Sequence, residues 1–182
     1  MGVCKSKCVK EQSYVKEQPY VKEQPYIKES RYIKESRNIP ENINPSTIDK
    51  FIPPITSGRV IKCYDGDTIT IASYLPYNES KLYKFSVRIN GIDCPEIRGK
   101  TENEKKCAFL SKIAVENKIL NKIVTLENVG TEKYGRILAD VIIDNISIGP
   151  WLIEQNLAVN YDGKTKHTPD DWLSYHNKYL AS

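Results

Sequence analysis

The sequence predicts an α+β domain: a five-stranded OB-fold β-barrel with about three helices, preceded by a disordered N-terminal tail that contains repeats. Short segments of alternating apolar and polar residues indicate the strands. A single long helical pattern falls after the third strand, as in this barrel class. A repeat containing prolines fills the first part of the chain. Of the residues, 40% are apolar and 27% are charged, which is ordinary for a soluble globular protein.

The first three strands are predicted from β-branched and alternating residues. Residues 59–64 and 68–72 read as a hairpin, and Asp65-Gly66-Asp67 between them is typical of its turn. A third strand is expected over residues 83–92. These segments are the first three of the five predicted strands.

The remaining elements follow in order. A helix is expected over residues 103–121, with Phe109, Leu110, Ile113, Ala114 and Asn117 on roughly one side. Residues 122–127 and 137–143 are predicted strands, and a short helix is expected over residues 148–156. Thr168 and Pro169 are typical of an N-cap and first position, and predict a last helix that begins there. His167 and His176 have no motif around them and are expected at the surface.

The N-terminus carries a pattern for lipid attachment. Gly2 and Ser6 fit the myristoylation signal, and Cys4 and Cys8 are candidates for palmitoylation. One acyl chain binds a membrane only marginally, and a second one makes the attachment stable. Three nearby lysines would add attraction to anionic lipid. We therefore expect a lipid-anchored peripheral protein on the cytoplasmic side of a membrane.

Residues 10–39 form a decaying six-residue repeat whose clearest copies read Lys-Glu-Gln-Pro-Tyr. Its period fits neither a helix face nor a strand face, and each copy has too little apolar surface to fold. The repeat is interpreted as a flexible spacer, with a docking or tyrosine-phosphorylation array as the alternative. We place the tail and linker at residues 1–56 and the folded domain at 57–182. The net charge of +4 permits a nucleic-acid partner without requiring one.

Five cysteines with irregular spacing do not suggest a disulfide framework, and a reducing compartment is expected. No apolar run approaches the roughly 20 residues that span a bilayer, and no secretory signal is recognised.

Three charged motifs lie at the ends of the predicted elements: residues 65–68 (Asp-Gly-Asp-Thr), 88–96 (Arg, then Asp-Cys-Pro-Glu) and 133–136 (Lys-Tyr-Gly-Arg). Each alone is typical of a turn, a strand exit or a solvated cation. As an ordered set, followed by Asn-Leu-Ala at 156–158, they resemble the staphylococcal nuclease (thermonuclease) family over about residues 58–161. The resemblance implies the OB-fold barrel and phosphodiester hydrolysis.

The resemblance implies a calcium site. Asp67 and Asp93 would be carboxylate ligands, and Cys94, where the family's founding type has Thr, would contribute its backbone carbonyl. Asp65 would support these ligands without binding Ca²⁺ itself. The oxygen ligands alone would also suit magnesium or manganese, and the Cys94 thiol would admit softer metals.

The resemblance also implies the catalytic residues. Glu96 would be the general base that orients or deprotonates the attacking water. Arg88 and Arg136 would grip the phosphate, because forked guanidinium groups match its oxygens. The residues that resemble the lining of the family's nucleotide pocket are Lys133, Tyr134 and Tyr161.

The function expected from this resemblance is a calcium-dependent endonuclease. It would hydrolyse DNA and RNA, prefer single strands, leave 3′-phosphate ends and act as a monomer. Together with the acylated N-terminus, the domain resembles membrane-anchored, calcium-dependent nucleases of plants. Two alternatives are a catalytically inactive OB-fold module that only binds nucleic acid, and a membrane-tethered interaction protein whose tail is the functional part.

Overall fold

The computed structural model describes residues 39–181, and the chain divides into two units between Ile48 and Asp49. In the first unit, a short 3-10 helix, η2 (Pro45–Thr47), is capped by Asn44. The second unit is the folded domain. The predicted acylation sites Gly2, Cys4 and Cys8 and nearly all of the repeat lie outside the described residues. Within residues 39–181, no helix has the length and apolar character needed to cross a membrane.

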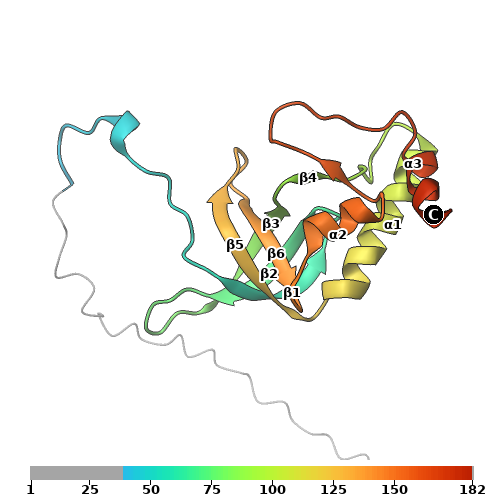
Figure 1. The fold of residues 1–182 in the computed structure, drawn as a ribbon. Coiled ribbons are helices and arrows are strands. Elements are labelled where there is room, and N and C mark those ends of the chain that lie inside the picture. The colour runs from blue at the N-terminus through green and yellow to red at the C-terminus, as the bar shows by residue number, and fades with distance from the viewer. Residues whose placement is uncertain (1–38, 182) are drawn as a thin grey trace, which may run out of the picture. The chain divides into compact units, whose positions relative to one another are not determined.

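Five strands form a closed β-barrel, which confirms the predicted α+β OB-fold (Figure 1). The antiparallel order is β3-β2-β1-β5-β6, and a parallel pairing of β3 with β6 closes the barrel. Two residues of β7 extend the sheet beyond β6. The strands are β1 (Ser57–Cys63), β2 (Thr68–Tyr74), β3 (Leu82–Ile89), β5 (Ile123–Thr131), β6 (Ile137–Ile143) and β7 (Ile146–Ser147).

Strand alternation builds the core. Successive residues of a strand point to opposite faces, so β6 buries every second side chain from Ile137 to Ile143. Val60, Ile69 and Val87 add fully buried side chains from three other strands. Ile55, which precedes the first strand, is also buried in this core. The three described cysteines outside the tail, Cys63, Cys94 and Cys107, are free and buried.

The long helix α1 (Glu102–Ile119) covers one end of the barrel, and Thr101 is its N-cap. The side chain of Thr101 accepts a hydrogen bond from the Glu104 backbone NH at 3.1 Å. The face that the sequence pattern marked is not the buried one, because Phe109 is 60% exposed. The buried residues are instead Cys107, Ala108, Ser111, Val115 and Ile119. Several of these are small, and this lets the helix approach the barrel closely.

Two shorter helices complete the domain: α2 (Ile148–Glu154) and α3 (Trp172–Leu180). The predicted start of the last helix at Thr168 is wrong. Asp171 is its N-cap and accepts a hydrogen bond from the Ser174 backbone NH at 2.7 Å. His176 is 8% exposed, and its Nδ1 lies 2.8 Å from the Gln155 carbonyl oxygen, so the expected surface position is also wrong. His167 is exposed as expected.

Gly66, in the β1–β2 turn, has no room for a side chain. A Cβ at this position would lie 1.9 Å from Ser111 Oγ and 2.8 Å from Cys94 Sγ. We expect Gly66→Ala to destabilise the domain by about 1–3 kcal/mol, the usual cost of overpacking. Thermal unfolding measures this effect. Gly130→Ala is the matched control, because its Cβ would meet only the Leu138 carbonyl oxygen at 4.0 Å. Equal stability of the two variants would contradict the close packing.

Candidate active site

The three sequence motifs meet at one end of the barrel. Asp67 immediately precedes β2, and its neighbour Thr68 pairs with Arg88 near the end of β3. Asp93 lies on the short strand β4 (Ile92–Asp93), which pairs with β8 (Val159–Asn160). The strand register therefore brings together residues that are far apart in the sequence.

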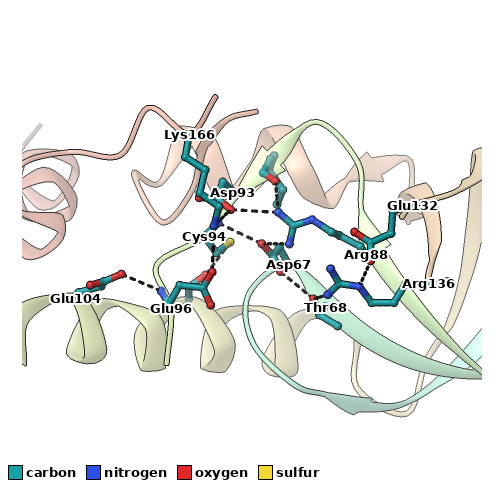
Figure 2. A network of polar contacts seen from close by, with 12 residues as sticks. Asp67, Thr68, Arg88, Asp93, Cys94, Glu96, Glu104, Glu132, Arg136 and Lys166 are labelled. Atoms are coloured by element: carbon teal, nitrogen blue, oxygen red, sulfur yellow. Dashed lines mark hydrogen bonds and ion pairs between the residues drawn. The ribbon is translucent and has the colours of Figure 1, made fainter. Parts of the chain in front are cut away.

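The Arg88 guanidinium lies between two buried carboxylates (Figure 2). It contacts Asp67 Oδ2 at 2.5 Å and Asp93 Oδ1 at 3.1 Å, and it also donates to the Ile92 carbonyl oxygen at 3.2 Å. The side chains of Arg88, Asp67 and Asp93 are only 12%, 7% and 2% exposed. Solvent screens these buried charges only weakly. Removal of one charged group would therefore leave its partner buried and unpaired, which is costly.

Asp65 adds a third carboxyl group to this cluster. Its Oδ1 is buried and has no hydrogen-bond partner among the described residues. Burial and the neighbouring charge of Asp67 raise the pKa of Asp65 to about 7. The cluster therefore holds more negative charge than Arg88 alone offsets.

Arg136 reaches the same cluster from the β5–β6 loop. Its Nη1 donates to Thr68 Oγ1 at 3.2 Å, and the Thr68 hydroxyl donates to Asp67 Oδ1 at 2.9 Å. Its Nε donates to Glu132 Oε1 at 2.6 Å, an ion pair that lowers the pKa of Glu132. The two arginines named by the motifs are thus linked through Asp67 and Thr68.

Glu96 is linked to the cluster by Lys166, a residue that the motifs did not identify. Lys166 Nζ lies 2.9 Å from Asp93 Oδ1 and 3.1 Å from Glu96 Oε1. The Glu96 side chain is 59% exposed, so it reaches solvent from the edge of the buried cluster. Lys166 comes from the segment between β8 and α3, and only the structure reveals its position.

Cys94 contributes through its backbone and not through its thiol. Its NH donates to Asp67 Oδ2 at 3.3 Å, while the Ser111 hydroxyl donates to Cys94 Sγ at 3.4 Å. Burial, with the nearby charge of Asp67, raises the pKa of the Cys94 thiol well above its ordinary value. The thiol is therefore protonated and packed against Ser111 of α1.

A cleft of about 530 Å³ opens beside the cluster. Arg88, Lys133 and Tyr161 line it, and the Arg88 Cζ lies 5.8 Å from the centre of the Tyr161 ring. Tyr134 lies 74% exposed beside Lys133, whose Nζ is 4.9 Å from its ring centre, and is not part of the lining. The structure thus gathers two of the three predicted pocket residues around Arg88.

The donors at this site suit a hard divalent cation. Asp67 and Asp93 face one guanidinium, Asp65 has an unpaired buried oxygen, and the Cys94 backbone lies beside them. Oxygen donors of this kind suit Ca²⁺ or Mg²⁺. Within residues 39–181, however, no three His, Cys, Asp or Glu side chains converge in a geometry that would hold a metal ion. Arg88 and Lys166 hold the carboxylates instead, and the predicted ligand set stays a prediction.

A closed five-stranded barrel with buried carboxylates and two arginines beside an open cleft defines an OB-fold protein with a strongly charged site at one end. The chain belongs to the staphylococcal nuclease family, since the family model described as staphylococcal nuclease homologue matches residues 86–178. A probable endonuclease of Schizosaccharomyces pombe is 34% identical over 85 residues, which is 43% of this chain and 37% of the relative. The match therefore spans little more than a third of that relative's length.

Lys166 gives a prediction about cation binding. Its ammonium group neutralises Asp93, so a cation that binds Asp93 must displace it. We expect Lys166→Gln to bind Ca²⁺ several-fold more tightly than the unmodified protein. Calorimetric titration of the substrate-free protein measures the affinity. Lys100→Gln is the control, because Lys100 lines the same small cavity as Lys166 and Asp93, whereas the ion partners of Asp93 are Lys166 and Arg88. An unchanged or weaker affinity in Lys166→Gln would contradict the competition.

Proposed function

We propose that this protein is a calcium-dependent nuclease that hydrolyses phosphodiester bonds of DNA and RNA, with a preference for single strands. The observation that carries the proposal is the arrangement of Arg88 between Asp67 and Asp93, with Arg136 linked to the same cluster, beside an open cleft. Membership of the staphylococcal nuclease family and the likeness to a probable endonuclease support it.

In this proposal, the chain's own residues bind the phosphate and activate water. The Arg88 and Arg136 guanidinium groups bind the phosphate oxygens and stabilise the charge that builds on them as water attacks. Asp67, Asp93 and the Cys94 carbonyl would hold Ca²⁺, which when bound offsets the charge of the phosphodiester. Arg88 would then exchange its carboxylate partners for the phosphate.

Glu96 is the general base of the proposed reaction. Its exposed carboxylate shares the Lys166 ammonium group with Asp93 and takes a proton from the attacking water. The bond from phosphorus to the 5′ oxygen breaks, that oxygen takes up a proton, and the other product keeps a 3′-phosphate. Cleavage of this polarity is what the family resemblance implies.

The proposal is tested by incubating the full-length protein with single-stranded and double-stranded DNA and with RNA, in calcium, in magnesium and in EGTA. We expect cleavage in calcium, faster on single strands, with 3′-phosphate ends identified by mass spectrometry. Binding of all substrates without cleavage in any metal would instead establish the nucleic-acid-binding module. Sedimentation in the same buffers would test the expected monomer.

We also propose that the protein is held on the cytoplasmic face of a membrane by myristate on Gly2 and palmitate on Cys4 or Cys8. The support is the N-terminal sequence pattern, including its lysines. In cells, we expect the protein to sediment with membranes and to carry both acyl groups. Gly2→Ala should move it to the soluble fraction. A soluble, unacylated wild type would overturn the anchor and leave the nuclease proposal standing.

A further inference from the structure

A second groove of about 490 Å³ adjoins the active-site cleft. Both cavities are lined by Glu132 and Lys133, which lie between β5 and β6. In OB-fold barrels, the loop between the fourth and fifth barrel strands is a common place for oligonucleotides to bind. The two cavities thus share a wall at the position where a bound strand would pass from one to the other.

The groove also continues along β3 from the site. Residues two apart on a strand share a face, so Lys84 and Ser86 lie on the same face as Arg88. Lys84 and Ser86 line the groove, while Arg88 lines the cleft. If Arg88 binds one phosphate of a nucleic-acid strand, the neighbouring nucleotides of that strand would lie over Lys84 and Ser86.

The linker before the barrel supplies the other wall. Lys50 and Phe51 line the groove, and the Phe51 side chain is 68% exposed. With Lys84 and Lys133, the groove contains three lysines. Its acidic lining residue, Glu132, is already ion-paired with Arg136 at 2.6 Å. The net charge of the groove lining is therefore positive, and the lining includes the exposed ring of Phe51.

We propose that this groove binds the nucleotides of a single-stranded substrate that lie beyond the scissile phosphate, with Lys50 and Lys84 on phosphates and Phe51 stacked on a base. Lysines along the backbone path and an aromatic ring for stacking are the features of sites that bind single strands without sequence preference. This inference rests on the proposed nuclease function. It adds a role for the linker, which the family motifs do not contain.

The test compares substrate lengths under conditions that allow no cleavage. Binding of a labelled dinucleotide and of an oligonucleotide of about 12 thymidines is measured in EGTA by fluorescence anisotropy. For Lys50→Gln/Lys84→Gln, we expect the slope of log affinity against log salt for the long strand to become less steep by about 1.4, or roughly 0.7 per lost contact. For Phe51→Ala, we expect about tenfold weaker binding of the long strand. The dinucleotide should change by less than about twofold in either variant.

Lys106→Gln is the matched control, since Lys106 is exposed on α1 and lines neither cavity. The proposal is overturned if the groove variants bind the long strand as this control does, or if the unmodified protein binds both lengths equally. It is also overturned if the variants lose affinity only for phosphatidylserine vesicles, which would assign the groove to a membrane. Length-dependent binding without cleavage in calcium would support the groove while the nuclease proposal failed.

Discussion

Glu96→Gln is expected to reduce the rate of phosphodiester cleavage by roughly 10²–10⁴-fold, the usual contribution of a general base. The amide keeps the size of the side chain but cannot accept the proton of the attacking water. Because Glu96 is 59% exposed, the exchange should leave the fold unchanged. Single-turnover cleavage of a labelled strand in saturating calcium measures the rate.

Glu102→Gln is the matched control for this prediction. Glu102 is also an exposed glutamate that pairs with a lysine, Lys105, and it lies on the first turn of α1. Cleavage by Glu96→Gln at the control's rate would show that another group activates the water. Affinity for uncleaved substrate should be similar in both variants.

Arg88→Gln is expected to lower the stability of the cation-free protein by about 3 kcal/mol, because it leaves buried carboxylates without their shared partner. The value lies at the low end of the usual range, since Lys166 still contacts Asp93 and Thr68 still donates to Asp67. For a domain of this size, Tm should fall by about 10 °C. Cleavage should also be lost, because the variant lacks one phosphate-binding guanidinium.

Calcium should restore part of the lost stability. In Arg88→Gln, a cation no longer competes with the guanidinium for Asp67 and Asp93, so added Ca²⁺ should raise Tm more than in the unmodified protein. Differential scanning calorimetry in EGTA and in calcium measures both shifts. Arg98→Gln, a change at an exposed arginine, is the control. No additional calcium shift in Arg88→Gln would mean that these carboxylates do not bind the cation.

Strand alternation and turn chemistry predicted most of the fold. The hairpin of β1 and β2, the strand β6 and the number of helices follow from local patterns of apolar residues and turns. The buried face of α1 did not, because close packing there favours small residues over the larger Phe109. The N-cap of α3 was also not predicted. The Asp171 side chain accepts a 2.8 Å hydrogen bond from Asn103 on α1, and this contact between distant parts of the chain is not visible in the local sequence.

The residues of the site that belong to recognisable sequence motifs could be predicted. Asp67, Arg88 and Asp93 were identified as a set, and the structure brings them into direct contact. Lys166 was not identifiable, because nothing in its neighbouring sequence indicates that it faces Asp93. Its contact depends on the path of a long segment between β8 and α3, which tertiary structure decides.

The pairing of β4 with β8 has a consequence for biosynthesis. Asp93 pairs with Val159, which follows it in the chain after α1, β5, β6 and α2. As the chain leaves the ribosome, the barrel strands up to β6 emerge before β8, the strand that pairs with Asp93. We therefore expect the nascent protein to be unable to cut the messenger RNA or ribosomal RNA around it until its last segment has emerged and docked.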